Sequence, residues 1–137
     1  MVNFLMIDDN PVEHLIMQRL FDKFHLFPGA KHSTDARLSM NLIGNCDITP
    51  GALPDVIFLD LNMPGFSGWD FLEEFNILYK KIRKPVDVYI ISSSINPEDR
   101  ELVNKYDFVK AMISKPIKVE TLLNLYSLYQ MARRAAS

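Results

Sequence analysis

The residues best suited to chemistry in this sequence are acids that follow short apolar runs. Asp8 and Asp9 follow one such run, and Asp60 lies near the end of another. Three carboxylates in one pocket would repel one another, and at least one would be pushed toward protonation. A hard divalent cation removes this repulsion, because Mg²⁺ binds carboxylates, backbone carbonyls and water in octahedral geometry. If the fold brings the acids together, we expect a Mg²⁺ or Mn²⁺ site.

A hydroxyl and an ammonium group follow two later apolar runs. Ser92 opens a run of three serines, and Lys115 precedes Pro116. Three acids and one lysine carry a combined charge of −2, which one Mg²⁺ neutralises. A carboxylate can attack phosphorus and form an aspartyl phosphate, and the transferred phosphoryl group then needs stabilisation on its equatorial oxygens. The metal, Lys115 and the Ser92 hydroxyl are the groups available for that task.

Five β-rich runs alternate with amphipathic helical patterns and would position these groups. The runs 56–61 and 87–92 show little alternation, which is typical of strands buried on both faces. Strands separated by helices predict right-handed βαβ units and a parallel sheet covered on both sides. The predicted fold is an α/β, flavodoxin-like (βα)5 three-layer sandwich with a doubly wound, five-stranded parallel sheet. Its predicted strands are 2–7, 30–33, 56–61, 87–92 and 109–114.

Helix signals fill the gaps between these runs. Asn10-Pro11 and Asn96-Pro97 each place a capping residue before a first-turn proline, and Ser33 or Thr34 is the predicted cap of the second helix. The third helix is predicted near 69–83, the last near 119–134, and 45–54 is the clearest loop. Apolar residues at helical spacing predict the packed faces: Val12, Leu15, Ile16 and Leu20 in the first helix, Ala36, Leu38, Met40, Leu42 and Ile43 in the second, and Leu72, Phe75, Leu78, Tyr79 and Ile82 in the third.

The fold rule for such sheets provides a test that needs no motif. Ligands bind beyond the carboxyl ends of the strands, near a switch in strand order. That rule brings Asp8-Asp9, Asp60, Ser92 and Lys115 to one edge of the sheet. Each has an ordinary explanation alone, as a cap, a turn, a loop or a solvated charge. Asn10 is already the better cap, however, and polar groups at four strand ends favour one shared site.

With these residues in this order, the sequence resembles a two-component response-regulator receiver domain, of the stand-alone, chemotaxis-regulator-like kind. The resemblance covers essentially the whole chain and implies a single receiver domain over 1–137. It implies a phosphorelay switch that accepts a phosphoryl group from a phosphohistidine and catalyses only its own phosphorylation and dephosphorylation. The residues that carry it are Asp8-Asp9, Asp60-Leu61-Asn62-Met63-Pro64-Gly65 with Gly68, Ser92 and Lys115-Pro116.

The same resemblance implies a role for each site residue. Asp9 would bind the metal directly, and Asp8 would act through water. Asp60 would be both metal ligand and phosphoacceptor, with the backbone carbonyl of Asn62 completing the protein's ligands. Ser92 would hydrogen-bond the phosphoryl group and Lys115 would pair with it. Met112 is a departure, because the family usually has an aromatic switch residue three positions before the lysine.

The resemblance also implies partners. A histidine kinase or a histidine phosphotransfer protein would be the donor. An unknown downstream protein would bind the face formed by the fourth helix, the fifth strand and the fifth helix, and the same face could support a homodimer after phosphorylation.

Composition argues against several other classes of protein. The net charge of −2 gives no general attraction to nucleic acid, and the basic run 80–84 is interpreted as complementing a helix dipole before Pro85. No segment has the length of a signal sequence or membrane span, and the single Cys46 excludes an intramolecular disulfide, so a cytoplasmic location is expected. The three histidines show no spacing typical of a metal cage, and His14 is expected to be at the surface or partly packed.

Two alternatives to the switch fit these residues less well. A phosphatase with an aspartyl-phosphate intermediate would place its nucleophile and general acid as Asp-x-Asp, whereas the second residue after Asp60 is Asn62. A flavin-binding protein of the same architecture would need a Gly/Ser/Thr-rich phosphate loop after the first strand. Asp8-Asp9-Asn10-Pro11 would instead repel a phosphate that comes without a metal. The residues therefore favour the phosphorylatable switch.

Overall fold

The centre of the computed structural model, which describes residues 2–45 and 50–136, is a parallel sheet in the order β2-β1-β3-β4-β5. This confirms the predicted doubly wound, five-stranded α/β fold. The strand order switches between β1 and β3, which pair in register with Ile7 opposite Leu59. The strands are β1 Phe4–Ile7, β2 Lys31–Ser33, β3 Val56–Leu59, β4 Asp87–Ser92 and β5 Val109–Ser114.

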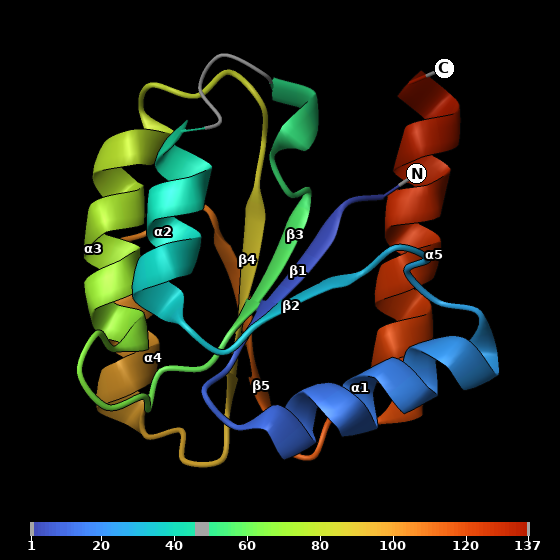
Figure 1. The fold of residues 1–137 in the computed structure, drawn as a ribbon, viewed down its shortest axis with the longest axis horizontal. Helices are drawn as coiled ribbons and strands as arrows, with labels where there is room; N and C mark the ends of the chain where they lie inside the picture. Colours follow the sequence, from blue (N-terminus) through green and yellow to red (C-terminus); the bar gives the residue numbers. More distant parts are fainter. Residues whose placement is uncertain (1, 46–49, 137) are drawn as a thin grey trace.

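Helices cover both faces of this sheet, with α1 and α5 on one side and α2, α3 and α4 on the other (Figure 1). Both predicted asparagine caps are confirmed: the Asn10 side chain accepts a hydrogen bond from Val12 N, and Asn96 accepts one from Asp99 N. The helices are α1 Pro11–Phe24, α2 Ala36–Gly44, α3 Gly68–Tyr79, α4 Pro97–Val103 and α5 Val119–Ala136, with a 3₁₀ turn at Pro50–Ala52.

The predicted cap of α2 is wrong. Asp35, not Ser33 or Thr34, has the extended backbone of an N-cap and accepts from Leu38 N at 3.0 Å. Ser33 is still the last residue of β2, and its hydroxyl accepts from Asp35 N instead. The chain therefore needs two further residues to leave the sheet before a helix can begin.

The predicted packed faces of α1 and α2 are partly wrong. In α1 the buried residues are His14, Met17 and Phe21, whereas Val12, Leu15 and Ile16 are each more than half exposed. In α2 the apolar residues that are buried are Ala36, Met40 and Ile43, and Leu38 and Leu42 face outward. Each helix carries two overlapping apolar stripes. Spacing alone does not decide which stripe faces the sheet.

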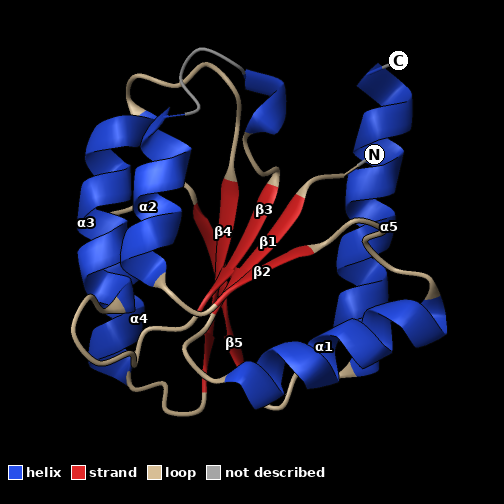
Figure 2. Cartoon of the chain, in the orientation of Figure 1, coloured by secondary structure: helices blue, strands red, loops and turns tan. Residues whose placement is uncertain are grey.

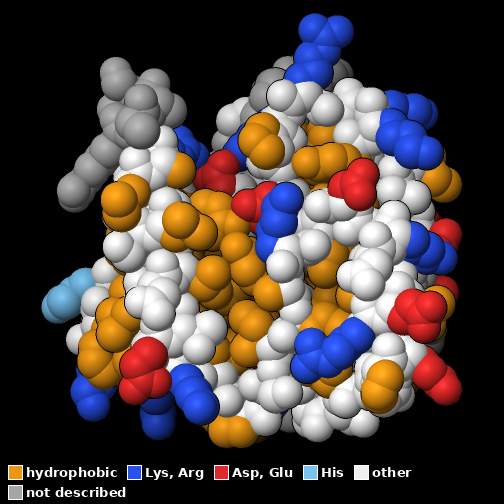
Figure 3. Space-filling view, turned by 180° about the vertical axis from the view of Figure 1, so that it is seen from behind, with side chains coloured by type: hydrophobic (Ala, Val, Ile, Leu, Met, Phe, Trp, Pro, Cys, Tyr) orange, Lys and Arg blue, Asp and Glu red, His pale blue; other side chains and the backbone are white. Residues whose placement is uncertain are grey.

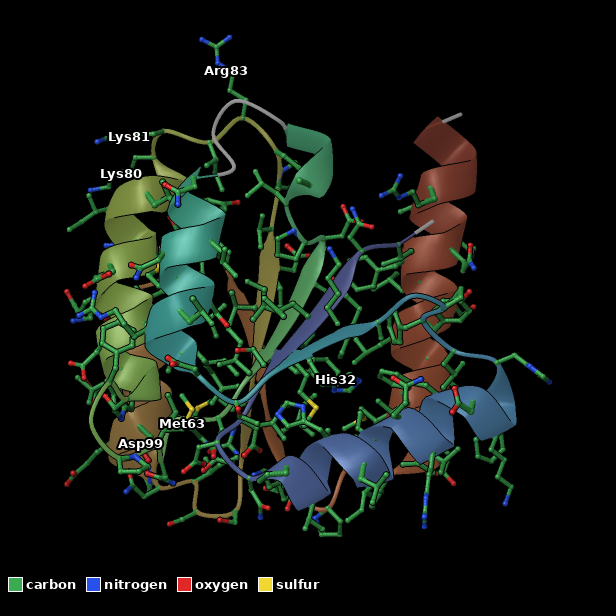
Figure 4. All side chains as sticks on the ribbon, in the orientation of Figure 1. His32, Met63, Lys80, Lys81, Arg83 and Asp99 are labelled. Atoms are coloured by element: carbon green, nitrogen blue, oxygen red, sulfur yellow. The ribbon has the colours of Figure 1, made fainter. Side chains whose placement is uncertain are left out.

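The basic run 80–84 lies beyond the third helix rather than in its last turn. The helix ends at Tyr79, so the predicted helix to residue 83 is wrong, and Lys80 is the residue of the basic run that caps the end of the helix. Lys84 turns back and pairs with Asp55 at 2.9 Å. Lys80, Lys81 and Arg83 extend away from the molecule, at the end opposite the carboxyl ends of the strands (Figure 4). Of the predicted loop 45–54, residues 46–49 lie outside the described residues, and Cys46 with them.

Two apolar cores hold the sheet edge in place. Val56 and Phe58 of β3 belong to the core under α1 and α5, whereas Ile57 and Leu59 belong to the core under α2, α3 and α4. All four side chains are buried, which explains why β3 shows no alternation in the sequence. Each fully buried side chain of this size contributes about 1.5–3 kcal/mol. The loops that follow the strands therefore start from well-packed strand ends. These ends lie together at one edge of the sheet (Figure 2).

None of the helices in 2–45 and 50–136 is long and apolar enough to cross a membrane.

Candidate functional site

The fold brings the three predicted acids together beyond the ends of β1 and β3. One carboxylate oxygen from each of Asp8, Asp9 and Asp60 lies within 4.8 Å of the other two. Asp8 is 2% exposed and Asp60 is 7% exposed, whereas Asp9 is open to solvent. Buried carboxylates are seldom left without a cation or a hydrogen-bond partner. The set of oxygen ligands and its charge suit a hard divalent cation such as Mg²⁺.

The electrostatics of Asp60 also favour a cation. Burial raises the pKa of its carboxyl group, and the charges of Asp8 and Asp9 raise it further. The Asn62 backbone N–H, which donates to Oδ1 at 3.2 Å, and the Lys115 charge oppose this rise without overcoming it. Ionising Asp60 in the protein without a cation therefore costs more free energy than ionising an unperturbed aspartate. A bound divalent cation would offset that cost.

Lys115 reaches this pocket but lies closer to Asp8 than to Asp60. Its Nζ is 2.8 Å from Asp8 Oδ2 and 3.8 Å from Asp60 Oδ2. Burial lowers the pKa of Lys115, but the Asp8 hydrogen bond and the Asp60 charge outweigh burial and raise it. Lys115 is thus a fixed positive charge between the two buried acids.

Ser92 is fully buried, and its hydroxyl forms hydrogen bonds with Ser94 rather than with Asp60. Its hydroxyl donates to the backbone carbonyl of Ser94 at 3.1 Å and accepts from Ser94 N at 3.2 Å. The Asn62 side-chain amide lies 3.4 Å from the same hydroxyl, which links the loop after β3 to the end of β4. Any contact between Ser92 and a group on Asp60 requires the hydroxyl to leave Ser94.

Two glycines shape the loop that follows Asp60. Gly65 has a positive φ of 76°, which glycine adopts without strain. Gly68 begins α3 directly against the site, and a Cβ there would lie 2.4 Å from Asp60 O and 2.6 Å from Leu61 Cα. Only glycine lets α3 approach the end of β3 so closely.

The site opens into a cavity of about 480 Å³ between α1 and the segment after β5. Its polar lining includes the three acids and Lys115, and its apolar lining includes Ile16 of α1 and Pro116. The cavity gives solvent and a small anionic group a route to the acids.

Sequence reasoning missed two histidines behind the acidic pair. His14 is 8% exposed, not at the surface, and its Nε2 lies 2.7 Å from the backbone oxygen of Asp8. Its Nδ1 lies 2.8 Å from Nδ1 of His32, eighteen residues away on β2. No local pattern reports this pairing. The parallel register of β1 and β2 places His32 opposite Met6, and the buried face of α1 brings His14 to it.

Comparison with known proteins agrees with this arrangement. A family model described as the response regulator receiver domain matches residues 4–127. The chain is 30% identical over 93 residues to protein-glutamate methylesterase/protein-glutamine glutaminase 3 of Burkholderia thailandensis, covering 68% of this chain and 23% of that protein. It is 23% identical over 127 residues to the sensory/regulatory protein RpfC of Xanthomonas campestris, covering 90% of this chain. That match spans only 16% of RpfC.

Solved structures share the fold. A two-component response regulator from Cytophaga hutchinsonii is 27% identical, with a TM-score of 0.79 over 91% of this chain and 93% of that one. The chemotaxis protein CheY4 of Vibrio cholerae is 22% identical, with a TM-score of 0.69 over 91% of this chain and 95% of that one.

Proposed function

Because this chain belongs to the response regulator receiver family, whose members are signalling modules of two-component systems, we propose that it is a phosphorylation-dependent switch. Asp60 would accept a phosphoryl group from a phosphohistidine with the help of Mg²⁺ or Mn²⁺. The observation that carries the proposal is the cluster of three carboxylates within 4.8 Å at the switch in strand order. We extend the proposal to one receiver domain over residues 1–137.

In the proposed reaction, a carboxylate oxygen of Asp60 attacks phosphorus while the bond from phosphorus to the donor imidazole breaks. The imidazole leaves with the electron pair of that bond and takes up a proton. Asp8, Asp9, Asp60 and the Asn62 carbonyl would hold the cation, which would offset the negative charge on the phosphoryl oxygens. Lys115 would turn from Asp8 toward a phosphoryl oxygen. Its Nζ already lies 3.8 Å from Asp60 Oδ2, so the movement would be small.

The proposed reaction is tested by incubating the protein with a small phosphodonor and measuring its intact mass. One phosphoryl group should be added in Mg²⁺, and none when a chelator removes the metal. The phosphatase alternative gains no support from the site. Asn62 is an amide without an acidic proton, and its side chain lies against Ser92.

We propose that the donor protein docks on α1. Val12, Leu15 and Ile16 form an apolar stripe on this helix, and Ile16 also lines the cavity that leads to Asp60. An apolar helix of a histidine kinase or phosphotransfer protein could cover the stripe and bring its phosphohistidine to the cavity.

A charge in this stripe should separate protein donors from small ones. Leu15→Lys should slow transfer from a phosphorylated kinase transmitter domain about tenfold or more, because it places a charge in a buried interface. Labelling by a small phosphodonor should be unchanged. Leu42→Lys is the matched control, since Leu42 is as exposed but lies on α2. Equal slowing by both variants would place the docking site elsewhere.

We propose that output leaves through the face of α4, β5 and α5, which would bind a downstream protein or a second copy. Apolar side chains gather in the middle of this side of the molecule, with charged groups around them (Figure 3). Leu102 of α4 and Leu128 of α5 are exposed, and β5 is an edge strand on which Met112 is half-buried. Phosphorylation would draw the Ser92 hydroxyl off Ser94 and displace the segment that leads into α4.

This output route predicts a defined pattern of spectral change. Adding beryllofluoride, a phosphoryl mimic, with Mg²⁺ should shift backbone amide resonances across residues 93–130 as well as around the acids. Because Met112 replaces an aromatic residue, we expect a shift of population between two packings. Amide changes confined to the loops at 8–9 and 60–68 would contradict the route.

A further inference from the structure

His14 forms a hydrogen bond with the peptide unit that joins Asp8 to Asp9. Its Nε2 is 2.7 Å from the carbonyl oxygen of Asp8, and both groups are buried. A carbonyl oxygen can only accept a hydrogen bond, so Nε2 of His14 carries a hydrogen and donates it. The neutral ring then leaves its Nδ1 as an acceptor.

This bond bears on both acids, because the Asp8 carbonyl and the Asp9 nitrogen belong to one planar peptide unit. The rest of Asp8 is already held: its N–H donates to Ser33 O at 3.1 Å, and its carboxylate accepts from Lys115 and from Asn10 N. Within the part of the chain that the structure describes, Asp9 has no comparable side-chain restraint. The direction in which Asp9 leaves the backbone therefore depends on the peptide plane that His14 holds.

The ring of His14 is itself fixed by a chain of contacts between α1 and β2. Its Nδ1 faces Nδ1 of His32 at 2.8 Å, and Nε2 of His32 is 2.8 Å from Gln18 Oε1. Gln18 donates its amide N–H to Asp22 at 2.8 Å, which fixes which amide atom faces His32. Figure 4 shows the side chain of His32 between its own strand, β2, and helix α1.

If Nδ1 of His32 donated to His14 and Nε2 donated to Gln18, the ring of His32 would be charged. Burial and the neighbouring His14 lower the pKa of His32, which favours the neutral ring. In the neutral ring Nδ1 still donates to His14, and the hydrogen bond from Nε2 to Gln18 is lost. The bond from His14 to Asp8 would persist, because the Asp8 carbonyl alone sets which nitrogen of His14 carries the hydrogen.

We propose that His14 is a positioning residue for the metal-binding pair, and that His32 holds its ring. His14 would orient the peptide between Asp8 and Asp9 so that both carboxylates face the cation. This inference rests on the proposed Mg²⁺ site. A residue that only filled space on the buried face of α1, as Met17 and Phe21 do, would be apolar and would leave the Asp8 carbonyl unpaired.

The first test compares two substitutions by calorimetric titration with Mg²⁺. His14→Phe keeps a ring of similar size but removes the donor, and should weaken Mg²⁺ binding about tenfold or more, as losses behind metal ligands do. His14→Gln retains an N–H at similar reach and should bind close to wild type. Phe21→Leu is the control for loosened packing, because Phe21 lies on the same buried face two turns away. It should lower the unfolding temperature and leave the affinity unchanged.

Equal weakening by His14→Phe and Phe21→Leu would overturn the inference, since the effect would then be general loosening. So would wild-type affinity in His14→Phe. A second measurement does not depend on the metal: long-range ¹H–¹⁵N spectra of the metal-free protein should show His14 protonated at Nε2. A hydrogen at Nδ1 alone would overturn the inference whatever the titrations give. Failure of the wild type to bind Mg²⁺, with Nε2 protonated, would instead refute the proposed function.

Discussion

Asp9→Ala should weaken Mg²⁺ binding by tenfold or more, and Asp8→Ala should weaken it less while destabilising the fold more. Asp9 is exposed and free to turn to a cation, so its loss removes a ligand and little else. Asp8 is buried and pairs with Lys115 at 2.8 Å, so Asp8→Ala leaves that ammonium without its nearest partner. Breaking a buried pair in this way costs about 3 kcal/mol, at the low end because Lys115 keeps some solvent contact.

Two measurements separate these effects: calorimetric titration gives the Mg²⁺ affinity, and denaturant unfolding without metal gives the stability. Glu98→Ala serves as a control for the loss of one exposed acid elsewhere, in the first turn of α4. Its Mg²⁺ affinity should match that of the wild type, and its stability should fall by no more than about 1 kcal/mol, because Glu98 complements the positive end of the α4 dipole. If Asp8→Ala weakens Mg²⁺ binding as much as Asp9→Ala does, the assignment of Asp9 as the direct ligand is wrong.

Asp60→Asn should stabilise the metal-free protein at neutral pH and remove most of the stabilisation that Mg²⁺ confers on the wild type. Burial raises the pKa of Asp60 above its unfolded value. Its contribution to stability is therefore present below the unfolded pKa and lost as pH rises through the folded pKa. Above the folded pKa the wild type carries the penalty of ionising this buried carboxyl group, and asparagine does not.

The Mg²⁺ effect on the wild type should be large. A cation at a hundred times its dissociation constant stabilises the folded state by about 2.7 kcal/mol. Asp60→Asn removes a ligand, so most of this gain should vanish. Asp107→Asn changes the charge equally at an exposed position outside the site and should behave as wild type. Thermal unfolding with and without Mg²⁺ measures both effects. A metal-free Asp60→Asn protein less stable than the wild type would contradict the burial argument.

The general fold and the main site residues could be predicted because both follow from repeated local signals. Apolar runs mark the strands, and the carboxyl ends of parallel strands must share an edge. Asp8 and Asp60 could therefore be placed together without knowledge of any contact. The nearest charged partner of each acid could not be predicted from the sequence. Two buried acids, Asp8 and Asp60, lie within 4 Å of Lys115, and only side-chain geometry shows that its closest contact is Asp8.

The errors concern choices that local sequence does not encode. α1 has apolar residues around much of its circumference, and a polar residue such as His14 counts as outward in any such pattern. The structure buries His14 because Asp8 O and His32 offer it partners from other segments. Likewise, α3 stops at Tyr79 although Ile82 continues the apolar spacing.

The most direct test of Asp60 as the phosphoacceptor is to locate the modified residue chemically. The protein is phosphorylated with a small donor and Mg²⁺, the acyl phosphate is reduced with borohydride, and the peptides are analysed by mass spectrometry. We predict reduction at Asp60 in the wild type and no labelling in Asp60→Asn. Reduction at Asp8 or Asp9, or undiminished labelling of Asp60→Asn, would contradict the assignment.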